Sequence, residues 1–317
     1  MKILVTGGAG FIGFHTVTAL LAQGNEVVIV DNFNDYYDPR IKEARIQQLP
    51  GAIVIRQDFS EIEAMKQVFK EHSFDKVCHL GAQAGVRYSL THPHVYVKSN
   101  VLGTLNMLEC CRHFNVKDLV FASSSSVYGG NTKIPFSETD PVEKPLSLYA
   151  ESKRTNELQA YAYHHLYGLN CTGLRFFNVY GEFNRPDLAA WKFTKAILDN
   201  TPIDVYNHGN MKRDWTYVGD IVRGISSALQ KPFPYELINL GNHQPVELTY
   251  FIELIEKELG KKAKKNLLPL QPGDVPMTWA DVSKAKKLLD WEPTTSIEEG
   301  VHKLMNWVKQ NMNLLVP

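Results

Sequence analysis

Short apolar runs alternate with amphipathic stretches over the first 180 or so positions of the 317-residue chain. Helical spacing of apolar residues predicts helices at Phe11–Gln23, Ile62–Glu71, His94–Phe114 and Leu148–Leu166. The runs between them are rich in β-branched residues and predict strands at Lys2–Thr6, Glu26–Val30, Ile53–Gln57, Lys76–His79, Leu119–Ala122 and Thr172–Phe176. Apolar strands that alternate with helices are typical of a parallel sheet covered on both faces. The pattern therefore predicts an α/β fold with a doubly wound parallel sheet.

The regular alternation ends near residue 180, and prolines then separate shorter strands and helices. We expect residues 181–317 to form a smaller C-terminal α/β lobe that binds the substrate. A segment at about 215–245 is expected to return to the sheet domain. A final amphipathic helix is predicted at Ser296–Asn311, packed on the outside of the molecule.

Charge and cysteine content exclude several functional classes. Lys plus Arg and Asp plus Glu both number 34, which argues against nucleic acid as the main partner. No apolar stretch reaches the length of a membrane span, and the apolar start lacks the cleavage site of a signal peptide. The four cysteines and eleven histidines lack metal-ligand spacing. We therefore expect no metal and no membrane contact, and a cytoplasmic location with reduced thiols.

A glycine-rich segment, Gly7-Gly8-Ala9-Gly10-Phe11-Ile12-Gly13, joins the first strand to the first helix. Small residues there let a pyrophosphate approach backbone N–H groups and the positive end of the helix. Asp31 ends the second strand, where a carboxylate accepts bonds from ribose hydroxyls and repels a 2′-phosphate. Residues 1–180 are thus predicted to be a Rossmann-type domain that binds NAD rather than NADP. The expected contacts are Gly7, Gly10, Phe11, Ile12, Gly13, Asp31 and Asn32.

Two further cofactor contacts are expected after the third strand. Asp58 is placed to bond the adenine, with Phe59 beside it. The alternative is that Asp58 only begins the next helix.

Tyr149 and Lys153 stand four residues apart, on one face of a predicted helix. Tyrosine titrates near pH 10, and a cationic neighbour favours its phenolate. A phenolate can take the proton of a sugar hydroxyl while hydride leaves the same carbon for NAD. The run Ser123–Ser126 lies at the carboxyl end of a strand, where ligands bind and a hydroxyl can bond the reacting oxygen. The alternative is a Tyr/Lys pair on a helix surface without function.

The chain resembles the extended short-chain dehydrogenases/reductases over nearly its whole length. This resemblance is carried by Gly7–Gly13, Ala122–Gly129 and Tyr149–Lys153. Among these enzymes the chain is similar to the nucleotide-sugar epimerases, and most of all to the UDP-glucuronate 4-epimerases. The narrower match is carried by Gln83–Ser89, Arg175–Gly181, Arg185–Asp187, Met211–Trp215 and Gln271–Pro276.

The resemblance implies specific roles. It makes Ser124, Tyr149 and Lys153 the catalytic triad, and it places Leu80, Ala82, Asn100, Ser123 and Phe177 near the cofactor together with Tyr149 and Lys153. It implies 4-epimerisation of UDP-glucuronate to UDP-galacturonate through a transient 4-keto sugar, with NAD kept bound through the cycle. Family members pair the helices around 94–114 and 147–166, so we expect a homodimer.

Several alternatives stay open. Asn178 stands where many glucuronate epimerases have Thr, and Glu182-Phe183-Asn184 replaces the usual Pro-Trp-Gly. A 4-epimerase of neutral or N-acetylated UDP-hexoses therefore remains an alternative, as does a UDP-glucuronate decarboxylase. Related dehydratases and decarboxylases carry acidic residues where this chain has Ser125 and Ser126, and neutral hydroxyls favour simple epimerisation. A silent NAD-binding sensor is disfavoured because the Tyr/Lys pair and the serine run are both kept.

The remaining candidates concern the sugar nucleotide. A 4-keto uronate is a β-keto acid that loses carbon dioxide readily, so we expect the pocket to restrain its carboxylate. The candidate partners are Arg185, donors around Asn178, and the region of Arg87 and Ser89. Arg185 pairing with Asp187 or Glu182 is the alternative. Arg213 offers a guanidinium fork to the substrate pyrophosphate, with an ion pair to Asp214 as alternative.

Three further side chains complete the expected substrate set. Asp274 is expected to bond the uridine ribose by family analogy, or else to cap a turn. Ser125 and Ser126 are expected to touch the sugar, or else to satisfy the strand end.

Overall fold

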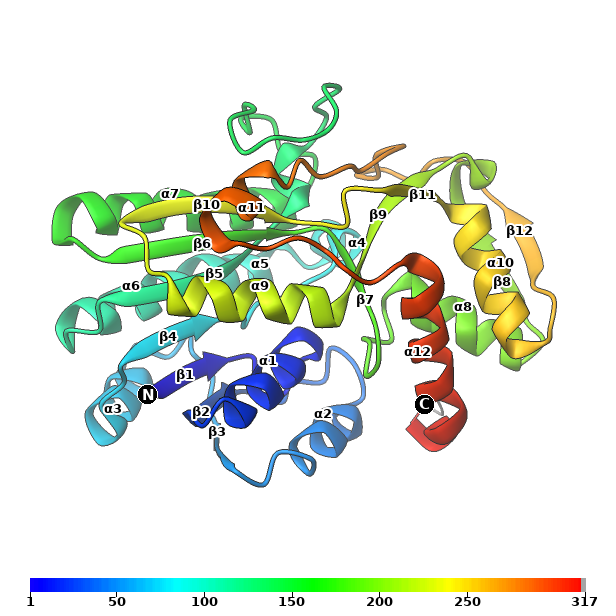
Figure 1. Ribbon diagram of the computed structural model, residues 1–317. Coiled ribbons are helices and arrows are strands. Elements are labelled where there is room, and N and C mark those ends of the chain that lie inside the picture. Colours follow the sequence, from blue (N-terminus) through cyan, green and yellow to red (C-terminus); the bar gives the residue numbers. More distant parts are fainter. Residues whose placement is uncertain (315–317) are drawn as a thin grey trace.

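The computed structural model describes residues 1–314 and contains a seven-stranded parallel sheet in the order β10-β6-β5-β4-β1-β2-β3 (Figure 1). Its strands are β1 (Lys2–Thr6), β2 (Glu26–Asp31), β3 (Ala52–Arg56), β4 (Lys76–His79), β5 (Asp118–Ser124), β6 (Asn170–Phe176) and β10 (Tyr235–Leu240). Every neighbouring pair runs parallel. The predicted doubly wound α/β fold is therefore confirmed, and β10 from the second half of the chain extends the sheet beside β6.

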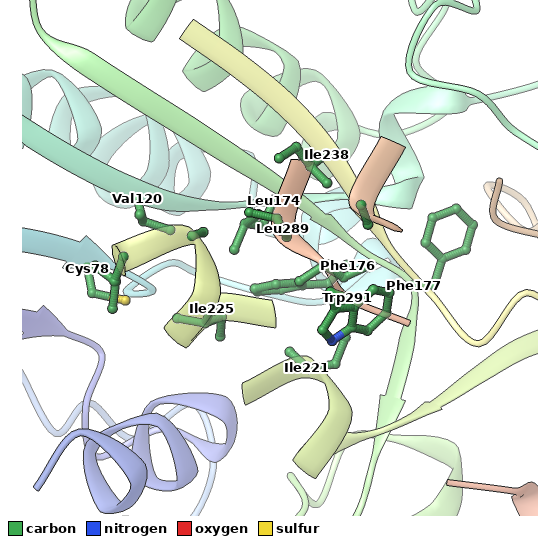
Figure 2. Close-up of a cluster of buried hydrophobic side chains, with 14 of the residues drawn as sticks. Cys78, Val120, Leu174, Phe176, Phe177, Ile221, Ile225, Ile238, Leu289 and Trp291 are labelled. Atoms are coloured by element: carbon green, nitrogen blue, oxygen red, sulfur yellow. The ribbon is translucent and has the colours of Figure 1, made fainter. Parts of the chain in front are cut away.

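Helices cover both faces of this sheet (Figure 1). One face carries α1 (Phe11–Ala22) and α9 (Val218–Gln230), and the other carries α3 (Ile62–His72), α6 (Gly103–His113) and α7 (Leu148–Tyr167). Figure 2 shows Ile221 and Ile225 of α9 close to Leu174 and Phe176 of β6. Because both faces are covered, the inner strands β1, β2 and β4 are largely apolar, which is the pattern seen in the sequence.

The predicted helix His94–Phe114 is not one uninterrupted α-helix. It comprises α5 (Pro93–Tyr96), a π-helical turn η1 (Val97–Leu102) and α6. Asn100 lies in this turn, where its side chain accepts a bond from Gln83 N at 2.7 Å and donates to Ser152 Oγ at 2.9 Å. Single π-helical turns often occur at functional sites, and this one connects the cavity wall at Gln83 with α7.

A second set of elements forms a lobe beside the sheet (Figure 1). Its helices are α8 (Ala189–Leu198), α10 (Leu248–Leu259) and α12 (Ile297–Gln310). Its strands are β7 (Asn178–Tyr180), β8 (Pro202–Val205), β9 (Lys212–Tyr217), β11 (Pro245–Glu247) and β12 (Lys264–Leu267). In its core Trp215 stacks on Phe251 with ring centroids 4.0 Å apart. Ser296 caps α12 by accepting a bond from Glu299 N.

Part of the predicted second lobe lies elsewhere. The short helix α11 (Ser283–Leu289) packs against β10 and α9, and Trp291 after it joins the core of the large sheet. The division at residue 180 therefore stays a prediction, and residues 283–291 form an additional segment on the sheet side.

The remaining short elements are α2 (Pro39–Ile46), α4 (Val86–Thr91), η2 (Ser125–Tyr128), η3 (Tyr206–Gly209) and η4 (Met312–Leu314). Across residues 1–314, none of the helices has the length and apolarity needed to cross a bilayer. The same residues contain no cluster of three His, Cys, Asp or Glu side chains arranged to hold a metal. All four cysteines are buried free thiols.

Candidate active site

A cavity of about 770 Å³ opens at the carboxyl ends of the parallel strands, beside the second lobe. It begins where the strand order reverses, between β1 and β4, since Gly7 follows β1 and Leu80 follows β4. In open α/β sheets, ligands bind at this reversal. The cavity extends past the serine run and α7 to Arg185 and Asp274 of the C-terminal half.

The glycine-rich loop has the close-packed shape that a phosphate cradle requires. Gly7 has a left-handed φ of +68°, and a Cβ at Gly13 would lie 2.1 Å from the carbonyl oxygen of Gly7. Helix α1 starts after Gly10 with no acidic residue in its first turn, and no side chain of residues 1–314 caps it. The first-turn N–H groups and the helix dipole are therefore directed at the cavity without a competing anion.

Asp31 at the end of β2 is only 5% exposed and makes an ion pair that the sequence did not reveal. Its Oδ1 accepts bonds from Lys42 Nζ and from Phe33 N, both at 2.9 Å. Both bonds use the same oxygen, so Oδ2 is left to accept ribose hydroxyls. Lys42 lies one turn into α2 and also lines the cavity, which makes it a candidate that sequence reasoning missed.

Asp58 has a different environment from the one predicted. Its Oδ1 accepts bonds from Ser60 N at 2.9 Å and Ser60 Oγ at 2.7 Å, just before α3. Burial opposes ionisation, but the bonds from Ser60 and Asn32 outweigh it and hold the pKa of Asp58 below its usual value. Asp58 does not line the cavity, whereas Asn32 and Phe59 do. The alternative of a helix-start aspartate fits this geometry.

Tyr149, Lys153 and Ser124 meet at one wall of the cavity. Burial raises the pKa of Tyr149 above its usual value, while the Ser124 hydroxyl and the Arg185 charge act in the opposite direction. Burial lowers the pKa of Lys153 to about 8, and its Nζ donates to Ala122 O of β5 at 2.8 Å. That Lys153 favours the Tyr149 phenolate therefore stays a prediction, because burial dominates the pKa of Tyr149 in the chain alone and the ammonium is directed at a strand carbonyl.

A buried ion pair supports this wall from behind. Glu157, one turn after Lys153 on α7, accepts bonds from Arg175 of β6 at 2.8 and 2.9 Å, and both side chains are at most 1% exposed. Glu157 also accepts a bond from Ser123 Oγ at 2.7 Å. Ser123 lines the cavity, but its hydroxyl is held by this carboxylate. A charged residue within the apolar strand Thr172–Phe176 was the signal that a buried partner had to exist.

At the opposite end Arg185 is paired within its own segment. Its Nε and Nη2 donate to Asp187 at 2.8 and 2.7 Å, and Tyr36 Oη donates to the same carboxylate at 3.2 Å. Burial opposes ionisation of Asp187, but the Arg185 charge outweighs it and keeps the pKa of Asp187 below its usual value. The predicted alternative of an Asp187 pair is thus realised, although Arg185 still lines the cavity and its charge acts on Tyr149.

Arg87 and Asp274 form a second pair at the cavity edge. Arg87 Nη2 lies 2.8 Å from Asp274 Oδ2, and its guanidinium stacks 4.0 Å from the centre of the Tyr206 ring. The Arg87 side chain is 45% exposed, so the pair is accessible to solvent. Asp274 was expected to bond a ribose or cap a turn, and in the structure it holds α4 against the segment 271–276.

Arg213 lies outside the main cavity and lines an adjoining one of about 130 Å³, which shares Ser125, Ser126, Asn178 and Asp274 with it. Its Nη1 donates to the carbonyls of Lys212 and Pro276, and burial lowers the pKa of Arg213 to about 10. The alternative pairing with Asp214 is wrong, since Asp214 accepts backbone bonds from residues 242, 243 and 280 instead.

Most of the predicted site residues line the main cavity. They are Gly7, Gly10, Phe11, Ile12, Gly13, Asp31, Asn32, Phe59, Leu80, Ala82, Arg87, Ser123, Ser124, Ser125, Ser126, Tyr149, Lys153, Phe177, Asn178, Arg185 and Asp274. Three do not: Asp58 bonds Ser60, Asn100 supports the wall from behind, and Arg213 lines the smaller cavity. Sequence reasoning missed Tyr36, Tyr37 and Lys42, which the segment after β2 brings into the cavity.

A parallel sheet with a glycine cradle at its reversal point, and with Ser124, Tyr149 and Lys153 at one wall, defines an extended short-chain dehydrogenase/reductase. Comparison with known families makes the assignment narrower. The chain belongs to the family described as GDP-mannose 4,6 dehydratase, whose model matches residues 4–304.

Relatives named for an epimerase activity are similar along almost the whole chain. The UDP-glucuronate 4-epimerase of Thermodesulfobacterium geofontis is 47% identical over 316 residues, which cover 98% of this chain and 97% of the relative. The crystal structure of the Bacillus cereus UDP-glucuronic acid 4-epimerase in complex with UDP-glucuronic acid and NAD has a TM-score of 0.91 at 36% identity, covering 98% and 99% of the two chains. The Thermotoga maritima UDP-glucose 4-epimerase with UDP-glucose has a TM-score of 0.91 at 32% identity, covering 98% and 100%.

Proposed function

We propose that the protein is an NAD-dependent nucleotide-sugar 4-epimerase that interconverts UDP-glucuronate and UDP-galacturonate through a transient 4-keto sugar. One observation carries the proposal: Tyr149, Ser124 and Lys153 share a cavity with the glycine cradle at one end and the Arg185 guanidinium at the other. The relatives that act on UDP-glucuronate support the same substrate.

The cavity residues fit a dinucleotide. Helix α1 directs uncapped first-turn N–H groups at it, and a Cβ at Gly13 would fill the turn. Asp31 keeps one carboxylate oxygen for ribose hydroxyls, which suits NAD and opposes a 2′-phosphate. Bound NAD supplies the acceptor and then the donor of the C4 hydride. Gly7–Gly13, Asp31 and Lys153 are the residues we assign to holding it.

Tyr149 is the group we assign to take the proton of the C4 hydroxyl and later return it. Its raised pKa keeps the phenol protonated in the chain alone, so the phenolate requires added positive charge nearby. The Ser124 hydroxyl partly opposes this rise in the pKa of Tyr149, and we assign it to bond the reacting oxygen. Lys153, fixed on Ala122 O, adds its charge at the same wall when it is protonated.

The serine run leaves epimerisation as the simplest outcome. Ser125 and Ser126 line the cavity where related dehydratases and decarboxylases carry acidic side chains, and a neutral hydroxyl does not do their acid–base work near pH 7. A 4-keto sugar formed there is reduced again, and reduction on its opposite face gives the 4-epimer.

Arg185 is the residue we assign to the uronate carboxylate. Asp187 uses its Nε and Nη2 edge, so Nη1 and the outer hydrogen of Nη2 remain to bond a second carboxylate. A carboxylate held in this way cannot turn freely into the perpendicular orientation that promotes loss of carbon dioxide. Arg185 would therefore contribute both substrate selection and protection of the intermediate.

The direct test is incubation of the purified protein with UDP-glucuronate, followed by separation of the sugar nucleotides. The expected product is UDP-galacturonate, with no net NADH. A UDP-pentose would instead support the decarboxylase. Absence of turnover in protein that binds NAD and UDP-glucuronate would support a silent sensor.

A neutral-hexose 4-epimerase is the second candidate, because Asn178 departs from the uronate pattern and Thr278 Oγ1 bonds its Oδ1 at 3.1 Å. Arg185→Met separates the two. We expect it to raise KM for UDP-glucuronate by about tenfold or more, as loss of a charged hydrogen bond predicts, and to leave UDP-glucose nearly unaffected. Lys192→Met removes an exposed cation of the same cavity and serves as the control. Better turnover of UDP-glucose than of UDP-glucuronate by the unchanged protein would favour the second candidate.

We also propose a homodimer through the helices around 94–114 and 147–166. Large apolar side chains on these helices face solvent, among them Val97, Leu158 and Leu166 at 57%, 53% and 64% exposure. Light scattering of the purified chain is expected to give twice the mass of one chain. A cytoplasmic location completes the proposal, supported by four free thiols.

A further inference from the structure

Arg45 of α2 is a fully buried guanidinium that has no carboxylate partner among residues 1–314. The buried Arg175 differs in this respect because it pairs with Glu157, and the half-buried Arg185 pairs with Asp187. An unpaired buried charge is costly, because neutral oxygens replace only part of its hydration. The buried charge of Arg45 would therefore be stabilised by a bound anion.

The acceptors on one side of Arg45 belong to the cofactor end of the cavity. Nη1 donates to Ala9 O at 2.9 Å, inside the glycine-rich loop, and to Tyr37 Oη at 2.8 Å. Ala9 lies between Gly7 and Gly10, which line the cavity, and Tyr37 lines it as well. The guanidinium thus lies directly behind the loop whose amides face the dinucleotide site. Because packed protein rather than water separates the guanidinium from the dinucleotide site, its charge acts on a diphosphate bound at the loop.

The acceptors on the other side belong to the segment 181–188, which carries Arg185. Arg45 Nη2 donates to Phe183 O at 2.7 Å. The same segment docks on α1 through His15 Nε2, 2.8 Å from Glu182 O, and through the Phe14 and Phe183 rings, whose centroids are 4.7 Å apart. One guanidinium therefore joins the loop at the cofactor end to the segment at the substrate end.

We propose that Arg45 is a positioning residue that couples the two ends of the active site. Its unpaired charge favours the diphosphate of the dinucleotide at the glycine loop, while its second nitrogen fixes the segment that holds Arg185. The inference rests on the dinucleotide site of the proposed function and does not depend on which sugar is the substrate.

Three probes that differ in charge test the first half of this proposal on protein freed of nucleotide: adenosine, ADP and NAD. In Arg45→Met we expect ADP and NAD to bind about tenfold more weakly, and adenosine to bind as in the unchanged protein. Calorimetry measures all three affinities. Arg40→Met is the matched control, because Arg40 lies on the same helix with a side chain 75% exposed.

Arg45→Lys tests the second half and covers the case in which Arg45→Met does not fold. Lysine restores the charge, but a single ammonium cannot bond Ala9 and Phe183 in the planar fork of arginine. We expect near-normal ADP affinity together with a KM for the sugar nucleotide raised several-fold. If Arg45→Lys has both a normal ADP affinity and a normal KM for the sugar nucleotide, the proposed coupling of the two ends is overturned. If Arg45→Lys loses ADP affinity, the proposed effect of the charge is overturned.

Two other results have distinct meanings. Equal weakening of adenosine and ADP in Arg45→Met would show a purely structural role and overturn this inference alone. Failure of the unchanged protein to bind either ADP or NAD would overturn the cofactor assignment, and the inference with it.

Discussion

The glycine loop at the nucleotide end differs from Arg185 and Arg87 at the sugar end in how the positive charge around it is balanced. At the nucleotide end, Arg45 and the start of α1 face the glycine loop with no carboxylate partner among residues 1–314. At the sugar end, Arg185 is paired with Asp187 and Arg87 with Asp274. The first arrangement is preorganised for an anion. In the second, a ligand must share or displace a carboxylate of the chain, so binding there selects among ligands.

The largest expected effect lies where the two ends meet. Tyr149→Phe removes the proposed proton acceptor and is expected to lower kcat by about 10²- to 10⁴-fold, the usual contribution of general acid–base catalysis. NAD affinity is expected to stay within a few-fold, because the nucleotide end does not depend on this hydroxyl. Initial rates and calorimetry check the two expectations. Tyr161→Phe, an exposed position on the same helix, is the control. Unchanged turnover in Tyr149→Phe would remove Tyr149 from the mechanism.

The next largest effect concerns the buried support of the catalytic wall. Glu157→Gln leaves Arg175 without its counterion and is expected to lower the free energy of unfolding by about 3–5 kcal/mol. Chemical denaturation measures this loss. Glu151→Gln changes an exposed carboxylate of the same helix and is expected to cost about 0.5 kcal/mol or less. Equal losses in the two variants would mean that the Glu157–Arg175 pair has no special role.

Lys153 predicts a specific pH dependence of stability. Its pKa falls from 10.5 to about 8 on burial, so the unfolded chain binds more protons than the folded chain between these values. Stability conferred by this site should therefore rise with pH above 8, by on the order of 1–3 kcal/mol by pH 10. Unfolding free energies of the unchanged protein minus those of Lys153→Met isolate this contribution from tyrosine ionisation. If this difference in unfolding free energy does not change between pH 8 and 10, the lowered pKa of Lys153 is contradicted.

The smallest effect is expected at the exposed pair of the sugar end. Breaking Arg87–Asp274 by Arg87→Ala, Asp274→Ala or both should give a coupling energy of about 0.2–1 kcal/mol, as for other solvent-exposed pairs. A double-mutant cycle on stability measures it. A coupling several times larger would mean that a ligand cannot readily displace this pair, which contradicts the selective binding inferred for the sugar end.

Local patterns were enough to predict most of the frame. Each of the six predicted strands is present. Helices pack on both faces of a parallel sheet, so its sequence alternates apolar strands with amphipathic helices, and this alternation can be recognised locally. The glycine cradle was readable from the spacing of glycines after a strand. The predicted continuous helix at 94–114 failed at Asn100, because the π-helical turn depends on distant partners, Gln83 and Ser152.

The sequence by itself determined which groups are available for the chemistry: a phenol, an ammonium, a serine run and a phosphate cradle at the carboxyl ends of parallel strands. Only the tertiary structure decided how their charges are balanced. It directs Lys153 at Ala122, pairs Arg185 with Asp187, and leaves Arg45 bonded to neutral oxygens up to 139 positions away in the chain. Local spacing reports what a side chain can do, whereas burial and distant partners set its charge, and these exist only once the chain has folded.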